Sequence, residues 1–151
     1  MKKIFTLIFT FLFAAGIAGC GKNDTISIDI DALSKELMEK VKFDDELVLS
    51  DSETAARLYG IESAVKSKLY IGSGATAEEI AVFEFGSVSD AEEGLKAAEA
   101  RISEQKKSYE SYAPDEIKRL DNSVVKCAGK YVAVCVTNDK AAEKIISEYL
   151  K

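Results

Sequence analysis

Hydrophobic and polar positions divide the chain into an apolar leader and a longer series of short amphipathic segments. Lys2 and Lys3 precede an uncharged, largely apolar run from Ile4 to Ile17. A signal-peptide core needs roughly 7–15 apolar residues, whereas a membrane-spanning helix needs ~20. The run therefore predicts an export signal and not a transmembrane helix.

The leader ends in Ile17-Ala18-Gly19-Cys20, where small residues precede a cysteine. This tetrapeptide resembles the lipobox of bacterial lipoproteins, with isoleucine in the place where leucine is usual. The resemblance implies that a signal peptidase recognises Ile17, Ala18 and Gly19, cuts before Cys20, and leaves lipid on that cysteine. Because two or more acyl chains hold a protein firmly at a membrane, a diacylglyceryl group would anchor it. The alternative is an uncleaved membrane anchor with an incidental cysteine.

The rest of the chain predicts a single domain. We expect a signal peptide at 1–19, a lipidated N-terminus and tether at 20–28, and one α+β domain at 29–151. The chain has 151 residues, of which 47% are hydrophobic and 30% charged. That length and composition are typical of a globular protein with one core.

Apolar residues at helical spacing predict several helices in this domain. Asp29 is expected to cap the first, and a second runs from Ser52 to Tyr59 and ends at Gly60. Ser89 and Glu92 form a capping box for a third, longer helix.

The long helix is expected to end before Pro114, because the residue before proline avoids helical geometry. A further turn at Asp115 to Leu120 and a last helix capped by Asn138 or Asp139 follow. The predicted buried stripe of the long helix consists of Leu95, Ala98, Ile102 and Tyr109. Its predicted water-facing side consists of Arg101, Lys106 and Lys107.

Strands are predicted between these helices. Val65, Leu69 and Ile71 alternate with polar residues as in a half-buried strand, and Glu79 to Phe85 is apolar on both faces, as in a central strand. The remaining predicted strands are Leu47 to Leu49 and a hairpin of Val124 to Cys127 with Tyr131 to Val136. This order predicts an α+β fold with an antiparallel sheet of about four to five strands and helices packed mainly on one face.

Charge and composition exclude several functions. The net charge is −6, and loss of Lys2 and Lys3 with the leader makes it −8. An acidic domain repels nucleic acid, which we exclude as a partner. The chain has no histidine, which excludes histidine-based triads and histidine-containing zinc sites. We expect no metal and no cofactor.

Several short motifs are similar to those of one family. Cys20, the segment from Gly72 to Phe83, Tyr112-Ala113-Pro114 and the hydrophobic hairpin resemble an uncharacterised family of small bacterial lipoproteins, domain of unknown function 4358. The resemblance extends over roughly Asp31 to Leu150. It implies a cell-surface location in a Gram-positive bacterium, and it assigns no activity, ligand or catalytic residue.

Candidate sites each have a simpler structural explanation. Cys127 and Cys135 are expected to be buried side chains and not a disulfide, because a two-residue turn places them on opposite faces of the hairpin. The Gly72-Ser73-Gly74 loop is either an anion-binding nest or, as we prefer, a hairpin turn. The acidic pairs are expected to be solvated surface, and they are Asp44-Asp45-Glu46, Glu78-Glu79 and Asp115-Glu116.

Aromatic residues near the end of the long helix supply the best candidate for a binding surface. Tyr109 and Tyr112, with Arg119 nearby, either line a shallow groove or form a packed corner, and we prefer the corner.

The leading functional hypothesis is a non-catalytic, membrane-anchored binding module on the extracytoplasmic face, whose partner is an unknown envelope protein or small ligand. One alternative is a histidine-free envelope hydrolase that uses a carboxylate pair. The other is a structural subunit of an envelope complex.

Overall fold

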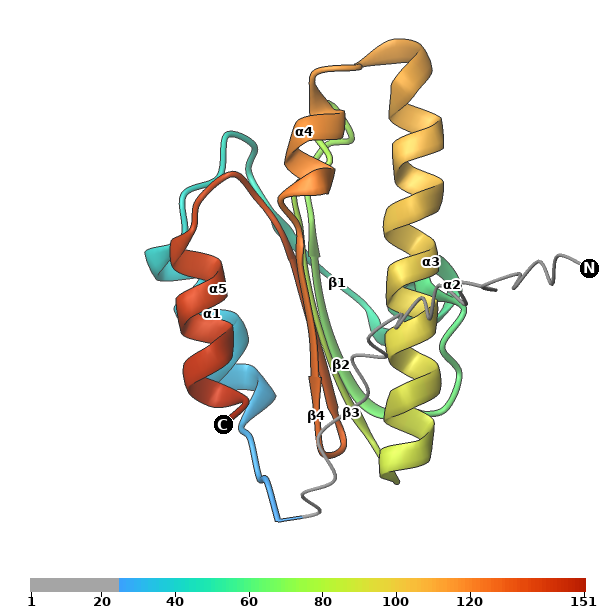
Figure 1. Cartoon of the computed structure of the whole chain (residues 1–151), viewed down its shortest axis with the longest axis vertical. Coiled ribbons are helices and arrows are strands. Elements are labelled where there is room, and N and C mark those ends of the chain that lie inside the picture. The colour runs from blue at the N-terminus through green and yellow to red at the C-terminus, as the bar shows by residue number, and fades with distance from the viewer. Residues whose placement is uncertain (1–24) are drawn as a thin grey trace, which may run out of the picture.

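The computed structural model describes residues 25–151 and shows a five-stranded antiparallel sheet with helices against it (Figure 1). The predicted leader and the start of the tether lie outside the described residues. The strands, in the order β1-β2-β3-β5-β4 across the sheet, are β1 (Val48–Ser50), β2 (Ala64–Ile71), β3 (Glu79–Phe85), β5 (Tyr131–Val136) and β4 (Val124–Ala128). The helices are α1 (Ile30–Lys40), α2 (Ser52–Tyr59), α3 (Val88–Tyr112), α4 (Glu116–Asp121) and α5 (Ala141–Tyr149). The predicted α+β class is confirmed.

Helices cover both faces of the sheet. Figure 1 shows α1 and α5 on one side and the long helix α3 on the other, and the buried residues form one core on each side. The expectation that helices pack mainly on one face is therefore wrong. The reason lies in the two central strands, since β3 is buried at all but one position and β5 throughout. A strand that is apolar on both faces needs cover on both.

The irregularity in β2 changes what lies at the sheet edge. The register between β2 and β3 shifts between Ala64 and Lys66, which is a β-bulge. Val65 is consequently 63% exposed, although its spacing predicts a half-buried position. A bulge leaves one residue out of the ladder and turns the local face outward.

The long helix begins two residues earlier than predicted. Ser87, not Ser89, is the N-cap, and its Oγ accepts a hydrogen bond from the Asp90 N–H at 3.1 Å. The Ser87 hydroxyl also donates to Asp90 Oδ2 at 2.8 Å. The N-cap serine therefore pairs with the residue three positions later, as predicted for a capping box, but the pair is Ser87 with Asp90 and not Ser89 with Glu92. The predicted buried stripe is confirmed, and Ala91 and Gly94 extend it.

The hairpin of β4 and β5 separates its two cysteines as predicted. Cys127 pairs with Val132, which belongs to the core beneath α3, whereas Cys135 pairs with Val124 and belongs to the core beneath α1 and α5. Cys135 is a buried free thiol, so the two cysteines do not form a disulfide with each other. Burial raises the pKa of the Cys135 thiol, which favours its protonated form.

Candidate functional site

Two carboxylates at the start of β3 are buried, and each contacts an arginine. Glu78 and Glu79 are 4% and 2% exposed, so the expectation that this pair is solvated surface is wrong. Glu79 falls on the same side of β3 as Ala81 and Phe83, which belong to the core beneath α3. That alternation is the sequence signal for its burial, because residues two apart in a strand share a face.

Glu79 is bound by groups from two helices. Arg101 of α3 donates from Nε to Oε1 at 2.9 Å and from Nη2 to Oε2 at 2.5 Å, and the Tyr59 hydroxyl of α2 donates to Oε1. Arg101 was expected to face water, but its side chain is 14% exposed. Burial and the neighbouring Glu79 charge raise the pKa of Tyr59 well above its usual value. This cluster fixes α2 and α3 to one end of β3.

Arg119 joins α4 to a second set of carboxylates. Its Nη2 donates to Asp44 Oδ2 at 2.5 Å, its Nη1 lies 2.8 Å from Glu78 Oε1, and its Nε lies 3.5 Å from Glu116 Oε2. Only the first of these contacts also has hydrogen-bond geometry, so the other two are ion pairs by proximity. Glu78 in turn accepts from the backbone N–H groups of Asp44 and Asp45 at 2.8–3.0 Å.

The glycine loop between β2 and β3 binds a carboxylate of the chain itself. Asp45 Oδ2 accepts from the Ser73 N–H and from the Ser73 hydroxyl, each at 2.8 Å. A Cβ at Gly72 would overlap the Asp45 carboxylate, and Gly74 has φ +90°. These contacts fit the predicted hairpin turn, and they fill the position where a nest would bind an external anion.

A small cavity of about 150 Å³ lies beside this loop, between β3 and α3. Arg101, Gln105 and Tyr109 line it from α3, and Glu79 lines it from β3. The Gln105 Oε1 atom is buried and has no hydrogen-bond partner among the described residues. Glu78 also lines it, and both oxygens of Glu78 and of Glu79 already accept hydrogen bonds. Among the described residues the cavity therefore offers no carboxylate oxygen without a donor.

The three residues predicted as a binding surface lie in different environments. Tyr109 is buried, and its hydroxyl donates to the Thr76 carbonyl at 2.6 Å. Arg119 is buried, and its guanidinium contacts the carboxylates described above. Tyr112 is 59% exposed, and its ring packs against that of Tyr109 with centroids 4.8 Å apart. The preferred interpretation, a packed corner, accounts for the contacts of Tyr109 and Arg119.

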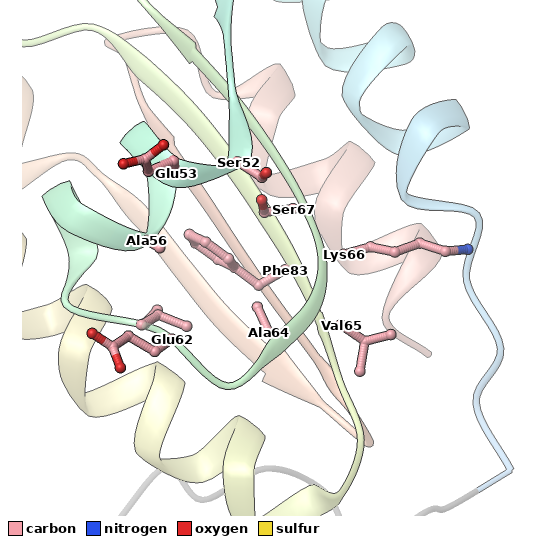
Figure 2. A pocket seen from close by; sticks show the side chains of 10 residues that line it. Ser52, Glu53, Ala56, Glu62, Ala64, Val65, Lys66, Ser67 and Phe83 are labelled. Carbon is pink, nitrogen blue, oxygen red and sulfur yellow. The ribbon is translucent and has the colours of Figure 1, made fainter.

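A groove of about 310 Å³ that the sequence did not predict lies between α2 and β2 (Figure 2). Phe83 lies behind it and Ala56 and Ala64 lie on its sides, while Glu53 and Glu62 are on the side of α2. The remaining lining residues are Ser52, Ile61, Val65, Lys66 and Ser67. The bulged residue Val65 borders the groove, and the alternating sequence pattern carries no signal of that register shift.

The groove borders an open part of the sheet edge. On its outer side β2 pairs with β1 only from Leu69 to Ile71, so within residues 25–151 the outer edge of 64–68 has no strand partner. Val48 and Leu49 of β1 are 62% and 51% exposed, and with Val65 they are three of the four large hydrophobic side chains exposed in the described part of the chain. Val48 and Leu49 lie opposite Ile71 and Tyr70, where β1 covers β2, and Val65 lies at the other end of the open edge. An open edge flanked by exposed apolar side chains is a candidate interaction surface.

Comparison with known proteins identifies a family. The model of the family described as Domain of unknown function (DUF4358) matches residues 39–137. The chain belongs to this family. No curated protein and no solved structure matches it. Within the DUF4358 chain the match takes in all five strands with α2, α3 and α4, and it leaves α5 and most of α1 outside. The family predicted from the sequence is confirmed, over a shorter span than expected.

Within 25–151 no helix is long and apolar enough to cross a membrane. The same part of the chain holds no group of three or more cysteine, aspartate or glutamate residues arranged to bind a metal ion.

Proposed function

We propose that this DUF4358 chain is a lipid-anchored, non-catalytic binding module on the extracytoplasmic face of the bacterial cell membrane. The anchor is the predicted lipid on Cys20. The binding site is the open edge of β2 with the adjoining groove. The observation that carries the proposal is the outer edge of 64–68, which has no strand partner within residues 25–151 and carries the exposed Val65, with the exposed Val48 and Leu49 on the neighbouring strand β1.

The contrast between this edge and the rest of the sheet supports the proposal. The buried carboxylates Glu78 and Glu79 contact arginines of the chain itself, and Asp45 fills the glycine loop. Those carboxylates already have partners within the chain, so their role in stabilising the fold accounts for their positions. At the open edge, backbone N–H and C=O groups and apolar side chains are available to another molecule, which is what recognition requires.

Site-specific photocrosslinking in the native host tests the proposal. A benzoylphenylalanine in place of Val65 is expected to give a discrete adduct, because the side chain projects from the edge at 63% exposure. The same residue in place of Lys144, which is exposed on α5, is the matched control on the other face. Identical adduct patterns at the two positions, or none at Val65, would contradict the proposal.

A histidine-free hydrolase that uses a carboxylate pair is the second candidate, because the buried Glu78 and Glu79 both line the cavity of about 150 Å³. It ranks lower for a geometric reason. Arg101 and Tyr59 occupy both oxygens of Glu79, so proton transfer to a substrate would first require breaking that cluster. A structural subunit is the third candidate, and a sedimentation experiment that shows self-association would favour it.

A further inference from the structure

We infer that the open edge of β2 binds an extended segment of a partner polypeptide, which pairs antiparallel with residues 64–68 and places a basic side chain in the groove. The inference rests on the proposed function and specifies its ligand. It combines two independent features of the site. These are a strand edge that has no strand partner within residues 25–151 and an unbalanced negative charge beside it.

The backbone geometry selects an extended segment. Strand β1 leaves the edge after Ser50, which pairs with Leu69, and Asp51 then caps α2. An added strand would continue the line of β1 and satisfy the N–H and C=O groups of 64–68 that point outward. Antiparallel pairing matches every other strand pair of the sheet and is the more stable pattern per residue.

The pleat of β2 then determines which partner side chain enters the groove. Ser67 pairs with Phe83 and lies on the face that lines the groove, whereas Lys66 and Lys68 pair with Glu84 and Val82 on the other face. Residues directly opposite one another share a face of the sheet. The partner residue opposite Ser67 would therefore extend over Phe83.

The charge of the groove favours a basic residue at that position. Glu53 and Glu62 line the groove, are exposed, and have no ion-pair partner within 4 Å among the described residues. Lys66 borders the groove, but its side chain points away from Phe83 (Figure 2), and its Nζ lies 3.7 Å from Glu84 Oε2. A lysine or arginine would lay its methylene stem along Ala56, Ala64 and Phe83 and keep its charged end near the two carboxylates.

The lysines of β2 itself disfavour a second copy of this chain as the occupant. If two β2 edges paired antiparallel about Ser67, Lys66 of one copy would lie opposite Lys68 of the other. Like charges at directly opposed positions destabilise a strand pair, and edge lysines commonly prevent such self-association.

Binding of designed peptides to the full-length protein in detergent micelles tests the inference. The probe is a six-residue peptide of alternating threonine and valine with lysine as its second residue and fluorescein at its C-terminus, because only one residue fits before β1 when the lysine lies opposite Ser67. Matched peptides carry glutamate in place of the lysine, or N-methyl groups on alternate backbone amides. We expect the lysine peptide to bind about tenfold more tightly than the glutamate peptide, and N-methylation to abolish binding.

Protein variants locate the effect. Glu53→Gln combined with Glu62→Gln should remove most of the preference for lysine, whereas the matched pair Glu92→Gln and Glu93→Gln, exposed on α3, should leave it unchanged. A nitroxide on the peptide N-terminus should broaden the amide resonances near Lys68 more than those near Ala64, because the added strand runs antiparallel to β2. Circular dichroism establishes that each variant is folded.

The outcomes separate this inference from the proposed function. Equal binding of the lysine and glutamate peptides, absence of binding, or broadening centred on Ala64 would overturn the inference. A dimer whose formation is lost on changing Val65 to aspartate would also overturn it in favour of a second copy. If an adduct specific to Val65 persists in cells while the peptides fail, the binding function stands with a different ligand. If the Val65 crosslink and the peptide binding both fail, neither the proposed binding function nor this inference holds for the β2 edge.

Discussion

Arg101 and Glu79 form a bidentate ion pair between the middle of α3 and the first residue of β3, with Nε 2.9 Å from Oε1 and Nη2 2.5 Å from Oε2. The two side chains are 14% and 2% exposed. The guanidinium also lies 4.9 Å from the centre of the Tyr59 ring, which belongs to α2. One buried charge pair thus connects two helices to the sheet on the face where the groove lies.

Removing the cation of this pair should be strongly destabilising. Arg101→Met leaves the Glu79 carboxylate buried without its compensating charge, and we expect a loss of about 3–5 kcal/mol in the free energy of unfolding. Urea unfolding followed by circular dichroism measures it. The double variant Arg101→Met with Glu79→Gln removes both charges and should lose less than the single variant. A single variant as stable as the parent would mean that the pair contributes nothing to folding.

A glycine-to-alanine change in α3 should also destabilise the protein, against the usual trend for helices. Alanine is normally more favourable than glycine inside a helix by about 1 kcal/mol. At Gly94, however, a Cβ would overlap the ring of Phe85, and the stripe is packed against β3. We therefore expect Gly94→Ala to lower stability by roughly 1–3 kcal/mol, as overpacked cores do.

Urea unfolding of a double-mutant cycle checks the cause. In a Phe85→Leu background, which removes the ring edge, Gly94→Ala should cost less than in the parent. An equal cost in both backgrounds would exclude the Phe85 contact as the origin of the effect.

The sequence predicted those features that depend on neighbours along the chain. The Asp29 cap, the end of α2 at Gly60 with φ 65°, and the β4–β5 hairpin follow from local rules and were placed correctly. The apolar pattern of β3 also shows that both of its faces are buried. That pattern implies helices on both faces of the sheet.

The features that the sequence did not predict depend on contacts between distant segments. Arg101 has the position of a water-facing helix residue, and only the approach of β3 gives it a buried carboxylate partner. Glu78 resembles a surface acid until the loop at Asp44 folds over it. The groove is bordered by a bulge at Val65, which no residue preference in the sequence predicts. Pairing and register across the sheet, not local propensity, decide each of these.

The contact between Asp45 and the glycine loop should make stability depend on acid pH. The Ser73 hydroxyl, and then the Ser73 N–H, hold the pKa of Asp45 below its ordinary value of 3.8. A lowered pKa means that the folded state favours the charged carboxylate, so its stabilising effect is present above pH 3.8 and is lost as the pH falls through the lowered value.

Asp45→Asn isolates this contribution from those of other acids. The difference in unfolding free energy between parent and variant should be constant at neutral pH and should shrink as the pH is lowered past 3.8. Urea titrations at a series of pH values measure it, and Asp115→Asn, at an exposed position without a side-chain cap hydrogen bond, is the matched control. A difference that does not change with pH would argue against the carboxylate contact.

Replacing Cys20 with serine tests the anchor on which the proposed location depends. The leader from Ile4 to Ile17 is too short for a bilayer-spanning helix, and the lipobox-like Ile17-Ala18-Gly19-Cys20 follows it. Without the thiol no diacylglyceryl thioether forms, so we expect Cys20→Ser to abolish labelling by fatty acid and to leave an uncleaved precursor. Labelled palmitate and intact-mass measurement in the native host read both effects. Cys135→Ala, at the buried free thiol, should keep its lipid, whereas unchanged labelling of the Cys20→Ser chain would remove the anchor from the proposal.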